Sequence, residues 1–480
     1  MTTSTTTSGF PSPPPSSWRS SPHLLFIPYP SSGHLIPLLD LAHRLLVAHP
    51  YFKITFLLTP PHHQNLSLPS NINTLVLTPP PPTSNFSLIK KIMALKELTG
   101  PIRDWYKTQK EEKKGSTIGG IVSDFFLGWT RDLAEELGIP RLTFCPSGAF
   151  GTAEFYTLWR DAPRKPNPGD PGFGVRFPGI PGEPVFPWWQ VSHVYRGVEG
   201  KGEEGREDWE FFRDCVRKNL ESDATIINSF EGFERAYVEY LKREMGNERV
   251  WTVGPLLPVE EEDLKSMAKR GGENSVPAEE VLEWLDRRKA CSVLYVCFGS
   301  RASLSGDQLR ALAAALESSG VDFMWAFRES DRANAGTIPE GFEDRVEGRG
   351  LVIRGWAPQL AILRHAATAA FLTHCGWNSV LESIAAGVMM VGWPQGADQF
   401  VDARLIQEVG AGLKVRVDGP ENVPGSEELA RLLKESVRED RPERIRVREL
   451  QVAAKVAVKE GGSSHKNLEQ LVSYLRQLKN

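Results

Sequence analysis

Acid–base chemistry is possible at His34, which follows Gly33 and precedes a segment with helical spacing of apolar residues. A helix N-terminus disfavours an added positive charge, so this imidazole is expected to stay neutral and able to accept a proton. Asp124 ends a strand-like run at residues 119–123. Both residues lie at the carboxyl ends of strands, where ligands bind in open α/β sheets, so they can share one cleft. The ordinary alternatives are an incidental histidine in a turn and an aspartate that caps a helix.

A second set of polar residues follows a strand-like run at residues 369–373, where the chain reads HCGWNS and a helix begins. Backbone N–H groups near Asn378 and Ser379 point out of the helix start, and Gly376 allows a ligand to approach the backbone closely. His374 adds a side-chain donor at the same place, as do the asparagine and the serine. This arrangement is typical of a pyrophosphate-binding site that needs no metal.

Glu382 follows on the same helical face, where its carboxylate could accept both hydroxyls of a ribose. Ser379-x-x-Glu382 also fits a capping box, and the residues alone leave this alternative open. The sequence contains no GxxxxGK(S/T) motif, no GxGxxG after a strand and no Asp-x-Asp pair. We therefore expect no metal site and no resident cofactor, with phosphates held by helix N-termini and neutral donors.

The segment 356–399 reads WAPQLAILRHAATAAFLTHCGWNSVLESIAAGVMMVGWPQGADQ. It resembles the donor-binding signature of plant secondary-product UDP-glycosyltransferases, which are family 1 glycosyltransferases, with WAPQ, THCGWNS, LE, GV, WP and ADQ in register. The resemblance covers nearly the whole chain, through YPSSGHLIPLLDLAHRL, CFGSRASLSGDQL, FMWAFR and GGSSHKNL. CPSGAF, GLVIRGWAPQ and GADQFVDARL are most similar to the phenolic and flavonoid O-glucosyltransferases of this family.

The resemblance implies a role for each matching residue of the donor site. Trp356 stacks on uracil, while the Ala357 backbone and Gln359 hold the uracil–ribose end. Glu382 binds the ribose diol. Residues at the ends of two strands surround the phosphates: Ser300, His374, Gly376, Trp377, Asn378 and Ser379.

The donor sugar is expected at the end of the signature. Asp398 and Gln399 hydrogen-bond the sugar hydroxyls, and Ser147 approaches them. The chain departs from the family pattern in having Ala369-Ala370 where Gly-Gly is usual and Met389 where proline is usual. These positions are strand-like, so the departures are expected to affect packing more than ligand binding.

The resemblance also implies the catalytic step. The residue matching His34 is the general base, and the residue matching Asp124 orients it, with the acceptor hydroxyl in the place that serine has in a hydrolase triad. The deprotonated acceptor attacks the anomeric carbon and UDP leaves from the opposite face, so the configuration inverts. Helix N–H groups and His374 stabilise the leaving-group charge.

Short apolar runs alternate with helical patterns, which indicates an α/β protein with parallel sheets. We predict two Rossmann-like domains facing across a cleft, the GT-B arrangement that the resemblance also implies. The expected strands of the first half are 23–28, 53–58, 74–77, 119–123, 140–144 and 225–228. Those of the second half are 292–298, 323–327, 351–353, 369–373, 388–392 and 413–417.

Composition shifts suggest the domain boundaries. Residues 1–22 are rich in Ser, Thr and Pro and are expected to form a disordered tail, with a transit peptide as the alternative. An acceptor-binding domain is predicted at 23–255, a linker at 256–290, a UDP-sugar-binding domain at 291–460, and at 461–480 a helix that could pack back on the first domain. Residues 150–210 are expected to form irregular surface loops, in which Trp188-Trp189 either lines an acceptor pocket or anchors a loop.

Bulk properties exclude several classes of protein. A net charge of −4 over 480 residues argues against a nucleic-acid binder. Five cysteines without a CxxC spacing suggest free thiols in a reducing compartment. No apolar run is long enough to cross a bilayer. We expect a soluble, cytoplasmic monomer whose partners are a UDP-sugar donor and a small aromatic acceptor.

The predicted function is inverting, metal-independent transfer of a sugar, glucose first, from a UDP-sugar to a hydroxyl of a small phenolic or flavonoid acceptor. UDP-xylose or another UDP-sugar as donor, and C-glycosylation, stay open. A UDP-sugar epimerase on the same architecture would not need the plant-type signature, and a non-catalytic UDP-sugar sensor would be expected to lack His34 or Asp124. The loops expected to face the acceptor carry the least sequence pattern.

Overall fold

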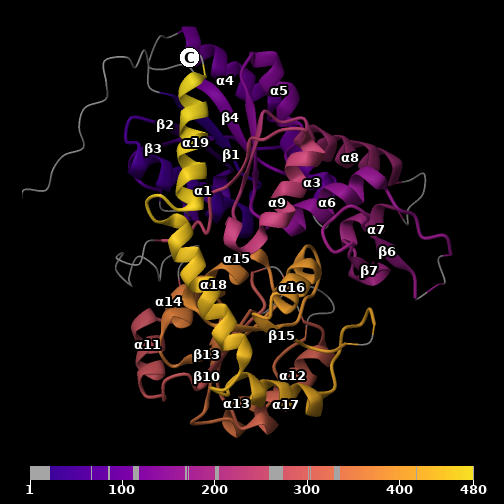
Figure 1. Cartoon of the computed structure of the whole chain (residues 1–480), viewed down its shortest axis with the longest axis vertical. Coiled ribbons are helices and arrows are strands. Elements are labelled where there is room, and N and C mark those ends of the chain that lie inside the picture. Colours follow the sequence, from indigo (N-terminus) through magenta and orange to yellow (C-terminus); the bar gives the residue numbers. More distant parts are fainter. Residues whose placement is uncertain are drawn as a thin grey trace, which may run out of the picture.

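A computed structural model describes residues 22–478 except 66–67, 85–86, 112–117, 168–169, 171, 200–204, 259–273, 301, 303, 329–335 and 418. The described residues form two α/β domains, each built on a parallel sheet, as the sequence predicts (Figure 1). Residues 1–21, which make up nearly all of the predicted tail, lie outside the described part, as does much of the predicted linker.

The sheet of the N-terminal domain has seven parallel strands in the order β3-β2-β1-β4-β5-β8-β9. Runs such as LLFI in the first strand are apolar throughout because both faces of the sheet are covered. Successive side chains of this strand, Leu24 and Leu25, accordingly belong to different hydrophobic clusters. The strands are β1 (His23–Ile27), β2 (Lys53–Leu58), β3 (Ile72–Val76), β4 (Ile118–Asp124), β5 (Arg141–Cys145), β8 (Ala224–Ile227) and β9 (Val250–Thr252).

The sheet of the C-terminal domain has six parallel strands in the order β12-β11-β10-β13-β14-β15. Its members are β10 (Val293–Cys297), β11 (Asp322–Phe327), β12 (Gly350–Arg354), β13 (Thr368–Thr373), β14 (Met389–Gly392) and β15 (Gly412–Lys414). In both sheets the strand order reverses in the middle, between β1 and β4 in the first and between β10 and β13 in the second. Such switch points are where open α/β sheets bind ligands.

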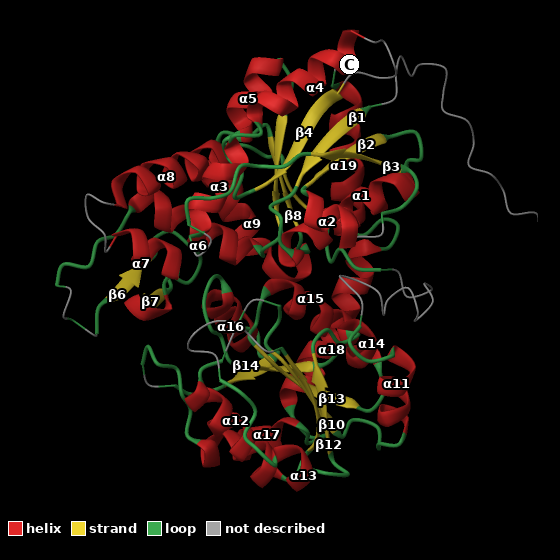
Figure 2. Cartoon of the chain, turned by 180° about the vertical axis from the view of Figure 1, so that it is seen from behind, coloured by secondary structure: helices red, strands yellow, loops and turns green. Residues whose placement is uncertain are grey.

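Helices cover both faces of each sheet (Figure 2). Those of the N-terminal domain are α1 (Ser32–Ala48), α2 (Pro60–Asn65), α3 (Leu88–Lys96), α4 (Thr99–Glu111), α5 (Thr130–Leu137), α6 (Ala149–Asp161), α7 (His193–Glu199), α8 (Arg206–Leu220) and α9 (Glu231–Met245). Those that follow are α11 (Ala278–Asp286), α12 (Gly306–Ser319), α13 (Phe342–Arg345), α14 (Gln359–Arg364), α15 (Trp377–Ala386), α16 (Gln399–Glu408), α17 (Ser426–Ser436), α18 (Pro442–Val458) and α19 (Ser463–Gln477).

The expectation of irregular surface loops at 150–210 is wrong for much of that segment. It begins with α6, continues through the antiparallel pair β6 (Gly174–Arg176) and β7 (Val185–Pro187), and includes the 3₁₀ turn Trp188–Gln190 and α7. Helix α6 is buried on nearly every side, so its sequence has no polar face and no helical period to recognise. Trp188 packs against Phe173 within this region, whereas Trp189 reaches Phe400 of α16.

The last helix returns to the first domain. Helix α18 runs along the C-terminal domain and α19 lies beside the N-terminal sheet (Figure 1). Trp251 Nε1 donates to Gln470 Oε1 at 3.0 Å, and Leu471 and Leu475 share a hydrophobic cluster with β1. Helix α11 falls inside the segment expected to be a linker and packs through Val281 and Leu285 into the C-terminal core.

Candidate active site

The two switch points lie at the interface between the domains. Three hydrogen bonds connect residues that follow N-terminal strands with residues that follow C-terminal strands. Asn378 Nδ2 donates to Gly33 O at 3.0 Å, and Trp377 Nε1 donates to Asn228 O at 2.6 Å. Ser147 Oγ donates to Asp398 Oδ2 at 2.8 Å. The carboxyl ends of both sheets therefore face this interface, and nearly all the predicted site residues are found here.

His34 and Asp124 meet at the switch point of the N-terminal sheet. His34 lies in the first turn of α1 just after β1, and Asp124 is the last residue of β4. His34 Nδ1 lies 2.8 Å from Asp124 Oδ2, with the aspartate side chain fully buried and the imidazole 16% exposed. Because the carboxylate can only accept, Nδ1 carries the proton and Nε2 is the nitrogen left with a free lone pair. The pair has the geometry of an oriented general base.

The helix-cap interpretation of Asp124 does not hold. The next helix, α5, begins at Thr130 and has Trp129 at its N-cap position. The second carboxylate oxygen of Asp124 instead accepts from the backbone N–H of Phe126 at 2.9 Å. This contact fixes the carboxylate, which in turn fixes the imidazole.

Aromatic rings surround the His34 imidazole. The ring of Phe126 lies 4.7 Å from it between centroids, Tyr29 lies at 5.3 Å and Phe125 at 5.9 Å. Phe155 of α6 continues this wall, 5.1 Å from Phe125. The imidazole therefore stands beside flat apolar surfaces suited to an aromatic ligand.

His374 occupies the equivalent position at the C-terminal switch point. It follows β13, and a Cβ atom on either Gly299 or Gly376 would lie 2.6 Å from its Nε2. Gly299 also has φ +75°, which a residue with a side chain adopts at a cost, so both glycines are needed for the ring to fit. Its Nδ1 is buried and has no hydrogen-bond partner among the described residues. Burial lowers the pKa of His374 to about 4, so this neutral ring can donate to a ligand without carrying charge.

Helix α15 begins directly after this histidine, with Gly376 as its N-cap and no side-chain cap. The capping-box alternative is therefore excluded, because Ser379 lies inside the helix. Glu382 is buried and its Oε2 accepts from Gln359 Nε2 at 2.7 Å. The same amide nitrogen lies 3.2 Å from Ser379 Oγ. These three side chains form one hydrogen-bonded group beside the helix start.

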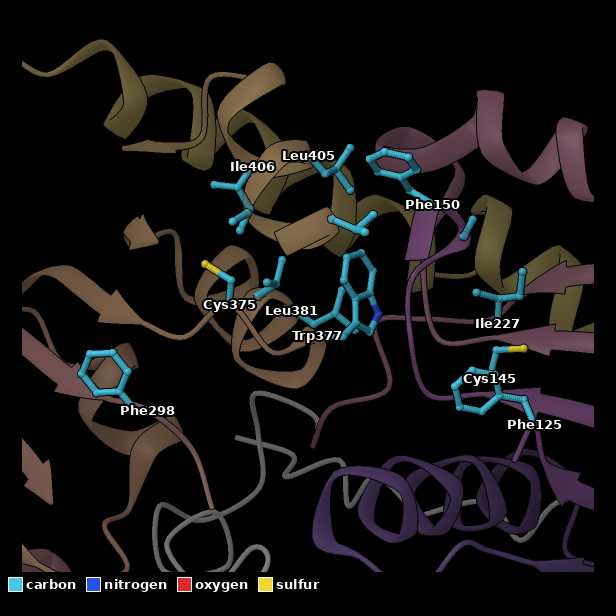
Figure 3. Packing of buried hydrophobic residues seen from close by; sticks show 14 of the residues in the cluster. Phe125, Cys145, Phe150, Ile227, Phe298, Cys375, Trp377, Leu381, Leu405 and Ile406 are labelled. Carbon is cyan, nitrogen blue, oxygen red and sulfur yellow. The ribbon is translucent and has the colours of Figure 1, made fainter. Parts of the chain in front are cut away.

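Trp377 has a different position from the one a phosphate-binding side chain would need. Its indole stacks on Phe233 of α9, with an interplanar angle of 10°. Figure 3 shows it among buried hydrophobic residues from both domains. With Nε1 bonded to the N-terminal domain, only its backbone N–H at the helix start is left to face a phosphate.

The residues predicted to contact the sugar lie where α16 meets α6. Asp398 is the N-cap residue of α16 and accepts the hydrogen bond from Ser147. Burial raises the pKa of Asp398. Gln399 Oε1 accepts from the backbone N–H groups of Gln395 and Gly396 at 2.9 and 3.0 Å. The amide oxygen is thus occupied within the loop, and Nε2 is the atom with which Gln399 can address a ligand.

The remaining predicted residues flank these groups. Trp356 is half-buried, and its backbone N–H donates to Ser275 Oγ at 2.8 Å. No aromatic ring of the described residues stacks on its indole. The Ala357 carbonyl accepts from Gln359 N, and the Ser300 carbonyl accepts from Arg328. Ala369, Ala370 and Met389, where the chain departs from the family pattern, are buried.

Sequence reasoning missed Gly299 and Asn228. Gly299 stands within CFGS beside the predicted Ser300, and a glycine after a strand at a switch point was the available signal. Asn228 acts through its backbone carbonyl, so its residue type carried no signal.

A cavity of about 820 Å³ lies elsewhere, between α6, α7 and α8, and its lining includes Trp159, Val198, Trp209 and Arg213. No predicted site residue is among the described residues that line it. Within the described ranges, no three His, Cys, Asp or Glu side chains are arranged to hold a metal ion. No helix in this part of the chain is long and apolar enough to cross a membrane.

Known proteins share this fold and sequence. A family model described as UDP-glucoronosyl and UDP-glucosyl transferase matches residues 230–442. UDP-glycosyltransferase 89B2 of Stevia rebaudiana is 42% identical over 484 residues, which cover 96% of this chain and 99% of that protein. Flavonol 3-O-glucosyltransferase UGT89B1 of Arabidopsis thaliana is 43% identical over 478 residues, covering 94% and 96%.

A crystal structure of Arabidopsis thaliana UGT89C1 complexed with UDP-L-rhamnose matches with a TM-score of 0.75 at 34% identity, over 95% of this chain and 99% of that chain. The same protein complexed with quercetin matches with a TM-score of 0.73 over 95% and 100% of the two chains. Fold and relatives together define a glycosyltransferase with two Rossmann-like domains. The chain belongs to the plant UDP-glycosyltransferases, enzymes that transfer a sugar from a UDP-sugar.

Proposed function

We propose that this enzyme transfers glucose from UDP-glucose to a hydroxyl of a small phenolic or flavonoid acceptor, with inversion at the anomeric carbon and without a metal. The observation that carries the proposal is the 2.8 Å hydrogen bond between His34 Nδ1 and Asp124 Oδ2 at the interface with the donor-binding residues. It leaves one imidazole nitrogen to take a proton from the acceptor, and the neighbouring aromatic rings supply a surface on which the acceptor can lie.

In the proposed reaction, Nε2 of His34 removes the proton of the acceptor hydroxyl as its oxygen forms a bond to the anomeric carbon. The bond from that carbon to the UDP oxygen breaks on the opposite face. Asp124 stabilises the imidazolium that forms. Charge developing on the pyrophosphate is met by the N–H groups at the start of α15 and by neutral His374.

Aromatic surroundings support a phenolic acceptor. Phe125, Phe126 and Phe155 form the wall beside the base. One relative is named a flavonol 3-O-glucosyltransferase, and the structure of another contains quercetin. Flat polyphenols fit such a wall and carry the hydroxyl that His34 would deprotonate.

Glucose is the proposed donor sugar because Gln399 presents an amide donor and Asp398 an acceptor for neighbouring hydroxyls. UDP-L-rhamnose, present in the structure of a relative at 34% identity, and UDP-xylose are the competing donors. The groups proposed to bind the phosphates, the N–H groups at the start of α15 and the imidazole of His374, are neutral, which supports metal-independent transfer.

Both halves of the site come from one chain, which supports a monomer as the working unit. All five cysteines are free thiols, which supports a reducing compartment such as the cytoplasm.

UDP release should be measured with quercetin and other phenols, each offered UDP-glucose, UDP-xylose, UDP-galactose and UDP-rhamnose. We expect acceptor-dependent UDP release that is fastest with UDP-glucose, and a β-configured product by NMR. Release that does not depend on an acceptor, or a product with retained configuration, would contradict the proposal.

A further inference from the structure

Carboxyl groups gather where α6 of the N-terminal domain packs on α16 of the C-terminal domain. A Cβ atom on Gly151 of α6 would lie 3.6 Å from both Asp398 Cβ and Asp402 Oδ1, so the two helices are in van der Waals contact at this point. Phe150 of α6 and Leu405 of α16 belong to the same buried cluster (Figure 3). Glu154, one turn after the glycine, adds a further carboxyl group to this contact.

Asp402 is the most unusual of these groups. Its side chain is 0% exposed, and neither carboxyl oxygen has a hydrogen-bond partner among the described residues. Glu154 is 7% exposed. An ionised carboxylate buried without partners is very unfavourable, so such a group normally keeps its proton.

Neighbouring acids further favour the protonated form of Asp402. In addition to burial, the nearby carboxyl groups of Asp398 at the start of α16, Glu154 on α6 and Glu234 on α9 raise its pKa. The carboxylate of Glu234 already accepts hydrogen bonds from the backbone N–H groups of Ala149 and Phe150 at the start of α6.

Two cations of the described residues lie near these acids, one on α16 and one on β15. Arg404 of α16 pairs with Glu408 and with Val185 O, and Lys414 of β15 and Asp402 both act on the buried thiol of Cys375. His34 is the basic group that acts on Asp398.

The carboxyl groups of Glu154 and Asp402 therefore keep their protons to a higher pH than exposed carboxyl groups do. Burial raises the pKa of Glu154 to about 8 and raises that of Asp402 well above its usual range. Both shifts favour the protonated, neutral form of the carboxyl group. Above about pH 8, ionisation places negative charges against one another, and against Asp398, in an interface that water hardly reaches.

We propose that Asp402 and Glu154 are positioning residues for the donor sugar, because only in their neutral form can α16, and with it Asp398 and Gln399, stay packed against α6. This inference rests on the proposed sugar contacts of Asp398 and Gln399. Ionisation of the cluster loosens the α6–α16 contact and separates Asp398 from Ser147. The groups around the start of α15, which are proposed to face the UDP part, lie on a different helix and are not part of the α6–α16 contact.

The test compares the Kd of UDP-glucose with the Kd of UDP, both measured without acceptor between about pH 7 and pH 9.5. For the unaltered protein we expect the Kd of UDP-glucose to rise by up to ~30-fold, the scale of one proton lost with a pKa of about 8, while the Kd of UDP changes little. Asp402→Asn and Glu154→Gln remove an ionisation without changing shape and should each flatten the UDP-glucose profile. Glu408→Gln, on the exposed side of the same helix, should leave it unchanged.

Melting temperatures separate this inference from the proposed function. A carboxyl group with a raised folded-state pKa binds more protons in the folded than in the unfolded protein, so stability falls as pH rises from about 4 towards the folded pKa. Asp402→Asn should therefore raise the melting temperature by at least ~2–4 °C at pH 9 and change it less at pH 5. The melting temperatures test the protonated cluster even if UDP-glucose does not bind. Absence of UDP-glucose binding would contradict the proposed donor and not the cluster.

Parallel melting profiles for the unaltered protein and both variants would overturn the protonated cluster. A changed melting profile together with an unchanged pH dependence of UDP-glucose binding would overturn its role in positioning the sugar.

Discussion

At the scale of single residues, the hydrogen bond from His34 Nδ1 to Asp124 decides which nitrogen can accept a proton. His34→Ala should lower turnover by at least ~100-fold, the usual scale for a lost general base, and leave UDP affinity nearly unchanged. Steady-state rates with a phenolic acceptor provide the measurement. His43→Ala, an exposed histidine on the same helix, is the matched control and should keep full activity. Near-normal turnover of the His34 variant would remove it from the mechanism.

Glu382 is a buried carboxylate that pairs with Gln359. Glu382→Ala should weaken UDP binding by about 1.5–3 kcal/mol, the range for hydrogen bonds to a charged group. Calorimetric titration with UDP measures this, and Glu382→Gln should recover part of the loss because it keeps one acceptor oxygen. UDP affinity that is intact in both variants would show that this carboxylate does not reach the ribose.

Gln399 uses its amide oxygen within the protein, which leaves its nitrogen for the proposed sugar contact. Its oxygen secures the loop N–H groups of Gln395 and Gly396, so only Nε2 can donate to a sugar hydroxyl. Gln399→His should lower the preference for UDP-glucose over UDP-galactose, chiefly by slowing glucose transfer. Gln399→Glu keeps the acceptor for the loop and loses the donor, so it should also slow glucose transfer. Competition between mixed donors is the assay, and an unchanged ratio in both variants would place donor choice elsewhere, with Ser147 the next candidate.

Sequence reasoning found the residues of the site better than it found what their side chains do. His34, Asp124 and the segment 356–399 carry recognisable residue types after strands, and the structure brings them to one interface. The roles of Trp377 and Gln399 depend on partners distant in sequence or on backbone N–H groups. No local sequence pattern encodes such partners. The interdomain contact of Trp377 and the hydrogen bonds to the amide oxygen of Gln399 could therefore be identified only from the structure.

At the scale of elements, the parallel strands were predictable because continuous apolar runs between helical patterns have few other interpretations. The strand Lys53–Leu58 agrees at both ends with the prediction, and most others shift by one or two residues. Helix α6 was missed because burial on nearly all sides removes its polar face, and the three-residue strand β9 is too short to show a period. Helix α6 lies at the domain interface, where it shares a buried cluster with α16 of the other domain.

Helix α15 connects the two domains through Trp377 and also carries part of the proposed phosphate site. Trp377→Ala should destabilise the protein by about 3–5 kcal/mol, the cost of deleting a buried aromatic side chain, and Trp377→Phe by about 1 kcal/mol for the lost hydrogen bond. Denaturant unfolding measures both. Trp356→Ala, at a half-buried tryptophan, should instead lower UDP affinity with little effect on unfolding. Equal stability of the Trp377 and Trp356 variants would contradict this division of roles.

At the scale of the whole molecule, the proposed phosphate seat uses N–H groups and a neutral imidazole with a pKa of about 4. Treatment with EDTA should therefore leave the rate of transfer essentially unchanged, because carboxylate pairs of the kind that hold magnesium with a pyrophosphate are not part of this seat. Rates before and after chelation, with magnesium added back, provide the measurement. Loss of activity that magnesium or manganese restores would contradict a phosphate-binding site built from neutral donors.

The return of the chain to its first domain has a mechanical consequence. The polypeptide passes between the domains once between β9 and α11 and again between α18 and α19, and Ser464 Oγ donates to Gly254 O at 2.6 Å where the two passages meet. Two crossings joined by a hydrogen bond limit the relative motion of the domains more than a single crossing would. The same restraint acts on the contact between Ser147 and Asp398, which also joins the two domains.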